Sequence, residues 1–132
     1  MNNNVSIIVG GSGQFGITLT KKLKKKNIVL VTTRSISRSK KKFYDLKNIK
    51  IVKLNIEKKK EIKRLIIKFK PKQIFYFAGQ SSPAVSFKKP EETYLSNFVG
   101  CKNFLEVIYE SGLKCKFLNA SSCEIYGNTK SK

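Results

Sequence analysis

Three glycines, Gly10, Gly13 and Gly16, follow a β-branched run at residues 5–9 and precede a segment with helical spacing. In a phosphate-binding turn, the first glycine makes the turn tight and the second lets the backbone approach a pyrophosphate. The third lets the helix pack closely on the strand. The N-terminal amides of that helix would then face the anion. Turns are often rich in glycine, but the strand before the motif and the helix after it favour dinucleotide binding over a simple turn.

The segment after the second expected strand, residues 28–33, indicates which dinucleotide is bound. A site for NAD places an acidic residue there to bind the ribose 2′-hydroxyl, whereas a 2′-phosphate is bound by arginine. No Asp or Glu occurs from Ile17 through Tyr44, and Arg34 and Arg38 follow the strand. The sequence therefore predicts NADP as the cofactor. The alternative is that both arginines belong to the general excess of basic residues.

Other residue types exclude several classes of chemistry. The chain has 132 residues and no His, which excludes nucleophile activation by a Ser–His or Cys–His pair and metal binding by imidazole. Its cysteines, Cys101, Cys115 and Cys123, have neither the spacing of a disulfide framework nor that of a CxxC metal site. We therefore expect a reducing, cytoplasmic location and no bound metal. No stretch approaches the roughly 18 apolar residues of a spanning helix, so no membrane association is expected.

The strongly basic composition suggests a nucleic-acid partner, but the type of basic residue argues against it. The formal charge is +20, from 28 Lys and Arg against eight Asp and Glu, and only three of the basic residues are Arg. Proteins that read bases and phosphates favour Arg for its bidentate geometry. Lysine runs such as residues 40–42 and 58–60 therefore indicate a solvated surface. We expect no specific nucleic-acid partner, only weak binding of polyanions at low salt.

Strands alternate with amphipathic helices along the chain. Strands are expected at residues 5–9, 28–33, 49–54, 73–77 and 115–120, with a weak helix or loop at 34–42. Pro83 and Pro90 are expected to bracket a loop or short turn before a long helix that ends at Gly112. This order predicts an α/β fold: a Rossmann-like, doubly wound parallel sheet of five strands. One NADP-binding domain is expected over residues 1–127, followed by a polar tail at 128–132.

Four segments carry a more specific similarity. Residues 78–91 read Ala-Gly-Gln-Ser-Ser-Pro-Ala-Val-Ser-Phe-Lys-Lys-Pro-Glu. They resemble a motif of the extended short-chain dehydrogenase/reductases that act on nucleotide sugars, above all the GDP-mannose 4,6-dehydratases, with Ser82 and Pro83 in place of His and Val. Gly-Gln-Phe-Gly at 13–16, Thr-Arg-Ser at 33–35 and Ala-Ser-Ser-Cys-Glu-Ile-Tyr-Gly at 120–127 resemble further motifs of that family.

The resemblance implies a role for each matching residue. The residues implied to bind the cofactor are Gly10, Ser12, Gly13, Gln14, Phe15, Gly16, Arg34, Asn55, Ile56, Ala78, Gly79, Gln80 and Ser121. Ser81 and Ser86 are implied to lie near the sugar. Ser122 falls on the hydroxyl that hydrogen-bonds the sugar O4, and Glu124 falls on the base that removes the C5 proton. Asn97, in an Asn-x-x-Gly motif, is expected to be mainly structural.

The resemblance implies a nucleotide-sugar 4,6-dehydratase with GDP-mannose as substrate. In that reaction a hydride passes from C4 to NADP, water is lost across C5 and C6, and the hydride returns to C6. Full-length members are expected to be homo-oligomers. One alternative is an epimerase or 4-keto reductase of the same family, although Glu124 favours dehydration because those reactions do not need that base. Another is a non-catalytic module that binds a dinucleotide or nucleic acid.

The family's chemistry also depends on a Tyr-x-x-x-Lys pair, in which the lysine lowers the tyrosine pKa. Tyr126 and Lys130 have this spacing. Tyr126, however, belongs to the Ser-x-Glu-x-Tyr-Gly motif, and Gly127 and Asn128 are poor helix residues. We therefore expect the catalytic pair, the last strands and the substrate domain to lie beyond Lys132, and the 132-residue chain to be inactive alone.

Overall fold

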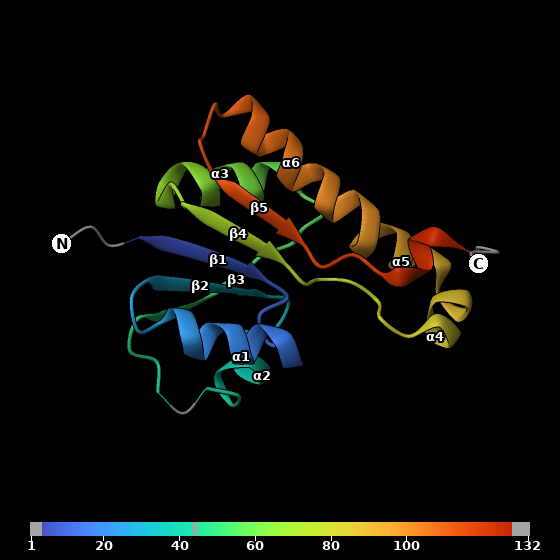
Figure 1. Ribbon diagram of the computed structural model, residues 1–132, viewed down its shortest axis with the longest axis horizontal. Helices are drawn as coiled ribbons and strands as arrows, with labels where there is room; N and C mark the ends of the chain where they lie inside the picture. The colour runs from blue at the N-terminus through green and yellow to red at the C-terminus, as the bar shows by residue number, and fades with distance from the viewer. Residues whose placement is uncertain (1–3, 44, 128–132) are drawn as a thin grey trace, which may run out of the picture.

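The computed structural model describes residues 4–43 and 45–127, with the side chains of Cys123 and Glu124 excepted. Within this part of the chain, five parallel strands form one sheet in the order β3-β2-β1-β4-β5 (Figure 1). The strands are β1 (Val5–Val9), β2 (Ile28–Thr33), β3 (Ile49–Lys53), β4 (Gln73–Tyr76) and β5 (Lys116–Asn119). The predicted Rossmann-like parallel sheet is confirmed. The expected tail at 128–132 lies outside the described residues.

The central strand, β1, explains why its sequence is a continuous β-branched run. It pairs with β2 on one side, with Val5 opposite Ile28, and with β4 on the other, with Ile7 opposite Ile74. A strand covered on both faces of a parallel sheet needs apolar side chains in both directions. Ile7 and Ile8, which point to opposite faces, are accordingly both fully buried.

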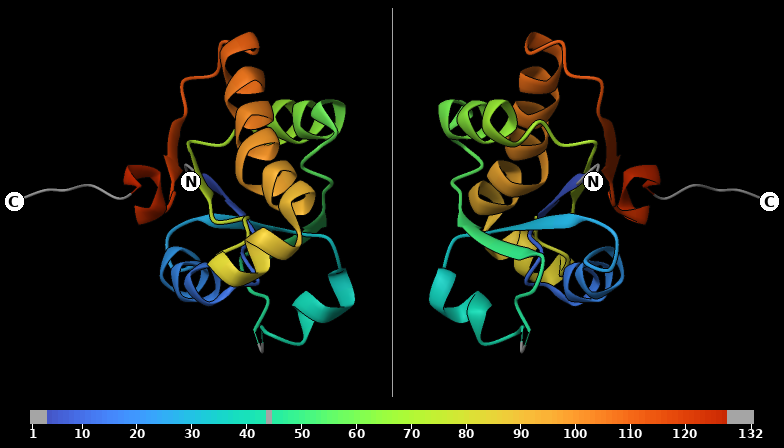
Figure 2. Two further views of the ribbon diagram at one scale, coloured as in Figure 1. Left: turned by 90° about the vertical axis from the view of Figure 1, so that its right-hand side faces the viewer. Right: turned by 90° about the vertical axis from the view of Figure 1, so that its left-hand side faces the viewer.

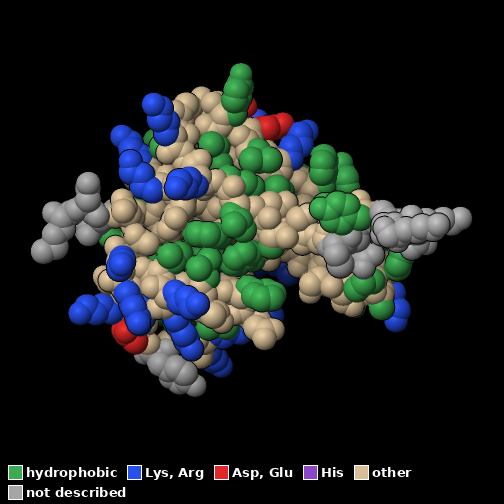
Figure 3. Space-filling view, viewed as in Figure 1, with side chains coloured by type: hydrophobic (Ala, Val, Ile, Leu, Met, Phe, Trp, Pro, Cys, Tyr) green, Lys and Arg blue, Asp and Glu red, His purple; other side chains and the backbone are tan. Residues whose placement is uncertain are grey.

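Helices cover the two faces of the sheet unequally (Figures 1 and 2). On one face α1 (Gln14–Leu23) packs against a core that contains Val29 and Val31, and α2 (Ile36–Lys40) lies beside β3. On the other face α3 (Lys59–Phe69) and α6 (Gly100–Glu110) cover a larger core. On the face seen in Figure 3, hydrophobic side chains gather in the middle of the surface. Leu118 of β5 is 48% exposed, so this part of the sheet is covered less completely.

The segment between the two prolines differs from the sequence prediction. In place of the expected loop or short turn, Pro83–Lys88 forms helix α4, and α5 (Pro90–Tyr94) continues through a π-helical turn at Leu95–Val99 into α6. The physical reason is that both prolines begin a helix, a position in which the missing N–H costs nothing. The Ser82 hydroxyl caps α4 by accepting a hydrogen bond from the Val85 N–H (3.4 Å).

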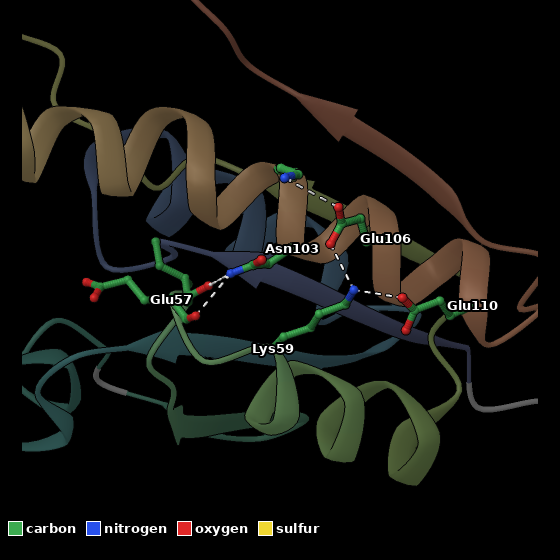
Figure 4. Close-up of polar contacts among 7 residues, drawn as sticks. Glu57, Lys59, Asn103, Glu106 and Glu110 are labelled. Carbon is green, nitrogen blue, oxygen red and sulfur yellow. Dashed lines mark hydrogen bonds and ion pairs between the residues drawn. The ribbon is translucent and has the colours of Figure 1, made fainter.

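Polar contacts fasten α3 and the loop after β3 to α6 (Figure 4). The Lys59 ammonium donates to carboxylate oxygens of Glu106 (2.8 Å) and Glu110 (2.7 Å). The buried Asn103 amide donates to the backbone oxygens of Ile56 (3.0 Å) and Glu57 (3.1 Å). The hydrogen bonds that its ammonium donates to these two carboxylates raise the pKa of Lys59. These contacts hold α3 and the loop after β3 against α6. Among the described residues, no helix combines the length and apolar character needed to cross a membrane.

Candidate functional site

The carboxyl ends of all five strands meet at one edge of the sheet, and the segments singled out in the sequence follow those ends. The chain winds outward from β1 to β3 and then returns to β4 on the other side of β1, so the strand order reverses between β1 and β4. In open α/β sheets, ligands bind outside the carboxyl ends at such a reversal. The loop after β1 and the loop after β4 touch there: a Cβ added to Gly10 would lie 2.7 Å from the Ala78 backbone nitrogen.

The three motif glycines are not equivalent in the structure. Gly10 has a left-handed backbone (φ +75°) and lies against the Ala78 backbone, and a Cβ on Gly16 would overlap the Gly11 backbone. Both are therefore required by packing. Gly13 has φ −77°, which any residue adopts, and an added Cβ would meet only the Gly10 oxygen, at an ordinary 3.4 Å. Packing within the described chain gives no reason for a glycine at position 13.

The start of α1 is suited to an anion. Gly13 is the N-cap residue, no side chain caps the helix, and the first turn contains no acidic residue. The N–H groups of the first helical turn, at Gln14, Phe15 and Gly16, have no intrahelical acceptor and carry the positive end of the helix dipole. Phe15 is 77% exposed beside them. The residues present therefore fit the pyrophosphate of a dinucleotide.

The segment after β2 folds into a compact turn that presents two arginines. The Thr33 hydroxyl accepts hydrogen bonds from the Ser35 N–H (3.1 Å) and the Ser39 hydroxyl (2.7 Å), which closes the turn. Arg34 and Arg38 are exposed on it. As the sequence predicted, Arg34 directly follows Thr33, the last residue of the second strand.

A lysine that the sequence analysis left within a run also reaches this edge. The Lys42 ammonium donates a hydrogen bond to the Ser12 carbonyl oxygen (2.8 Å) and so joins the segment after α2 to the glycine loop. Thirty positions separate the two residues. In the sequence, Lys42 looks the same as the other lysines of the run 40–42, so this contact could be identified only from the fold.

The loop after β3 uses its predicted site residues locally. The Asn55 side-chain oxygen accepts a hydrogen bond from the Glu57 N–H (3.0 Å), and the Asn55 N–H donates to Glu61 (3.0 Å). Ile56 packs against the larger core, and a Cβ on Gly100 would press on it at 2.7 Å. Asn55 and Ile56 thus lie at the carboxyl edge, where part of the Asn55 side chain is already occupied by its own turn.

Asn97 shapes the loop after β4. Its side-chain oxygen accepts from the Gln80 N–H (2.7 Å), and its amide donates to the Gln80 carbonyl (3.1 Å). It also packs on Gly79, where an added Cβ would lie 2.8 Å from the Asn97 oxygen. These contacts agree with the structural role expected of Asn97. The Gln80 side chain turns along the loop and accepts from the Ser82 N–H (3.1 Å).

The residues predicted to lie near a sugar follow in the same loop and after β5. Ser81 is exposed, and the Ser86 hydroxyl donates to the Pro83 carbonyl (2.6 Å). After β5, Ser121 takes a left-handed backbone (φ +56°), and its N–H donates to the Asn119 side chain (3.2 Å). Ser122 is exposed beside it.

The remaining predicted catalytic position lies in a short helix. A 3₁₀ helix spans Cys123–Tyr126, so the backbone of Glu124 is placed at the carboxyl edge. The side chain of Glu124 lies outside the described part of the structure, as does Lys130. Tyr126 ends that helix and is exposed.

The tyrosine and thiol groups with raised pKa values are held in the packing of the fold. Burial raises the pKa of Tyr76, whose hydroxyl donates to the Ser96 carbonyl (2.5 Å), and it raises the pKa of the thiols of Cys101 and Cys115. A raised thiol pKa keeps these cysteines protonated and unreactive. Among the residues described, no group of three His, Cys, Asp or Glu side chains could hold a metal ion.

Comparison with known proteins identifies the family of the chain. The sequence profile described as GDP-mannose 4,6 dehydratase matches residues 7–132. The chain belongs to the GDP-mannose 4,6-dehydratase family. It is 30% identical over 139 aligned positions to the GDP-mannose 4,6-dehydratase of Vibrio cholerae serotype O1, an alignment that covers 96% of this chain and 37% of that protein.

Two solved structures show the same fold. The UDP-Glc/GlcNAc 4-epimerase of Campylobacter jejuni superposes with a TM-score of 0.84 at 26% identity, covering 98% of this chain and 40% of that one. The UDP-glucose 4-epimerase of Brucella ovis, solved in complex with NAD, gives a TM-score of 0.80 at 21% identity, covering 98% of this chain and 38% of that one. The chain thus spans about two fifths of the length of these relatives. It is related to a dehydratase and to an epimerase of nucleotide sugars.

Proposed function

We propose that residues 1–127 form the NADP-binding domain of a nucleotide-sugar 4,6-dehydratase whose substrate is GDP-mannose. Gly13 carries the proposal, because nothing in the surrounding packing requires a glycine there. A ligand whose pyrophosphate approaches the backbone at the start of α1 supplies the missing reason. The dehydratase of Vibrio cholerae, 30% identical over most of this chain, supports the choice of reaction.

The dinucleotide would be held by residues from each loop at the carboxyl edge. The loop and first helical turn formed by Gly10, Ser12, Gly13, Gln14, Phe15 and Gly16 would bind the pyrophosphate. Arg34 would pair with the 2′-phosphate, since a guanidinium matches phosphate geometry. Asn55 and Ile56 would contact adenine, the former through its side-chain amide. Ala78, Gly79, Gln80 and Ser121 would line the rest of the cofactor.

The catalytic roles follow from the motif at the end of β5. When bound, NADP supplies the acceptor and later the donor of hydride. The Ser122 hydroxyl would hydrogen-bond the sugar O4, and the Glu124 carboxylate would take the C5 proton. Ser81 and Ser86 would contact the sugar. Because the Ser86 hydroxyl hydrogen is engaged with Pro83, the Ser86 oxygen would act as an acceptor of a sugar hydroxyl.

An epimerase is the second candidate, and one observation favours it. The TM-score of 0.84 relates this fold to a solved 4-epimerase at 26% identity, a level comparable to the similarity with the dehydratase. The presence of Glu124, a base that dehydration needs, makes the dehydratase the preferred proposal.

Calorimetric titration of the 132-residue chain tests the cofactor. We expect NADP to bind with a micromolar or weaker Kd and NAD to bind more weakly still. The variant Gly13→Val is expected to lose binding of both. Equal or tighter binding of NAD would refute the preference for the 2′-phosphate. Binding of polyanions that falls steeply with salt and ignores Gly13→Val would support the nucleic-acid alternative.

Turnover assays test the reaction. With GDP-mannose and NADP, we expect no 4-keto-6-deoxy product from the 132-residue chain. Tyr126 has the Tyr-x-x-x-Lys spacing, but it belongs to the Ser-x-Glu-x-Tyr-Gly motif, so we do not expect it to act as the catalytic tyrosine. Formation of that product would establish dehydration and overturn the expected inactivity. Conversion of UDP-glucose to UDP-galactose would instead establish the epimerase.

A further inference from the structure

Lys42 joins two segments that would contact the pyrophosphate and the ribose of a dinucleotide in the proposed site. Its ammonium donates to the Ser12 carbonyl oxygen at 2.8 Å. Ser12 immediately precedes Gly13 at the start of α1, where a pyrophosphate would lie. The backbone of Lys42 belongs to the segment that leaves β2, where the ribose would lie.

The backbone of Lys42 is held firmly although its side chain is exposed. The Lys42 N–H donates to the Ser39 carbonyl (3.0 Å), and the Phe43 N–H donates to the Lys40 carbonyl (3.2 Å). Phe43 is buried in the core between the sheet and α1. The attachment point of the Lys42 side chain is thus fixed relative to the glycine loop, which limits the entropy lost when its ammonium binds an anion.

The charges around Lys42 leave its ammonium available. Asp45, the nearest acidic residue in the sequence, pairs instead with Lys24 (2.5 Å), which together with the Lys47 N–H lowers the pKa of Asp45. Among the described residues, no ion pair includes Lys42, Arg34 or Arg38. An ammonium has three donors, and the Ser12 carbonyl takes one.

We propose that Lys42 is a specificity residue for the 2′-phosphate of NADP, binding it from the side of the glycine loop while Arg34 binds it from the end of β2. This inference rests on the proposed dinucleotide site. It assigns Lys42 a role that a purely structural brace would not have. A brace between Ser12 and the segment after α2 would support NAD and NADP equally, whereas a phosphate contact supports only the dinucleotide that carries the 2′-phosphate.

The test compares Lys42→Ala, Lys42→Arg and the control Lys41→Ala in the 132-residue chain. Lys41 is adjacent, exposed and equally charged, so its variant matches the loss of net charge. Titrations with NADP, NAD, 2′,5′-ADP and ADP isolate the contribution of the 2′-phosphate. We expect Lys42→Ala to weaken NADP and 2′,5′-ADP about 10-fold, in line with a hydrogen bond to a charged group at an exposed site. We expect NAD and ADP to change less than about twofold and Lys42→Arg to restore most of the NADP affinity.

Three results would overturn the inference in different ways. Equal losses for NADP and NAD in Lys42→Ala would make Lys42 a brace of the loop. An equal effect of Lys41→Ala would reduce the contribution to general surface charge. Absence of binding by the unsubstituted chain would refute the proposed dinucleotide site itself, together with this inference. Circular dichroism and thermal unfolding of each variant separate these results from a loss of fold.

Discussion

The difference between Gly13 and Gly16 makes a sharp test of what the glycine motif is for. Gly13 is the N-cap residue of α1 and Gly16 is in its first turn, and spacing alone does not distinguish their roles. A methyl group on Gly16 would overlap the Gly11 backbone, whereas a methyl group on Gly13 would touch only the Gly10 oxygen at 3.4 Å. Substitution by alanine should therefore damage the fold at position 16 and the ligand site at position 13.

The magnitudes follow from local geometry. For Gly13→Ala, the poorer N-cap costs up to about 1 kcal/mol, and the reduced freedom of the unfolded chain returns about 0.4–1 kcal/mol. The net change in unfolding free energy is near zero, so Tm should move by less than about 3 °C. For Gly16→Ala, overpacking against backbone costs about 3 kcal/mol and better helix propensity returns about 1 kcal/mol. That net loss of about 2 kcal/mol corresponds to a Tm lower by roughly 6–10 °C.

The assay pairs thermal unfolding with NADP titration of each variant. Gly13→Ala should retain its Tm and lose at least about 10-fold in NADP affinity, because the methyl group obstructs a charge-assisted hydrogen bond to the pyrophosphate. Gly16→Ala should lose Tm first. If Gly13→Ala binds NADP as tightly as the unsubstituted chain, the reasoning that a ligand explains Gly13 is wrong. If it unfolds as readily as Gly16→Ala, the reasoning from packing is wrong.

Two further substitutions test the supports of the site. Asn97→Ala removes both hydrogen bonds to Gln80 and should lower the unfolding free energy by about 1–2 kcal/mol and weaken NADP binding, measured by urea unfolding and calorimetry; unchanged binding would mean that the loop keeps its shape without this clamp. Lys59→Met breaks two half-exposed ion pairs and should lower Tm slightly at neutral pH, with the difference suppressed near about 1 M salt. The pKa of Glu106 is lowered and that of Lys59 is raised, so the ion pairs contribute to the unfolding free energy at neutral pH. This contribution is lost as the pH falls through the folded pKa of Glu106, and also as the pH rises through the folded pKa of Lys59. A Tm difference that persists at pH extremes would assign Lys59 a packing role instead.

The sequence predicted the strands well because burial on both faces imposes a simple pattern. Val5–Val9 and Ile28–Thr33 are runs of β-branched and apolar residues that end at glycine or polar residues, and their observed bounds match the prediction. The prolines were harder to interpret. Pro83 and Pro90 were taken as boundaries of a loop, yet each begins a helix. The Ser82 cap before Pro83 and the two glutamates after Pro90 are the sequence signals that indicate these helices.

The arrangement of the site depended on contacts that spacing does not encode. The strand pattern places Asn55 after β3, but it does not reveal the hydrogen bond that the Asn55 side-chain oxygen accepts from the Glu57 N–H. It identified the glycine motif without separating Gly13 from its partners. Lys42 reaches Ser12 across 30 positions because β1 and β2 are neighbours and the chain after α2 comes back to the glycine loop. Such a contact follows from the fold and cannot be read from a run of lysines.

The positions of the acidic residues bear on the cofactor more directly than the net charge of +20. Residues 1–56, which contribute β1, β2 and β3, contain 13 Lys and Arg and one acidic residue, Asp45, whose carboxylate is held by Lys24. Residues 90–110 contain four Glu and one Lys, and two of these Glu serve to bind Lys59 of α3. Glu106 and Glu110 thus join α6 to α3, whereas no acidic residue directly follows β2, where an NAD site would place one to bind the ribose 2′-hydroxyl. Among these 13 basic residues, Arg34 and Arg38 follow β2, and Lys42 contacts the glycine loop. In the proposed site these three cations would favour a 2′-phosphate over a 2′-hydroxyl.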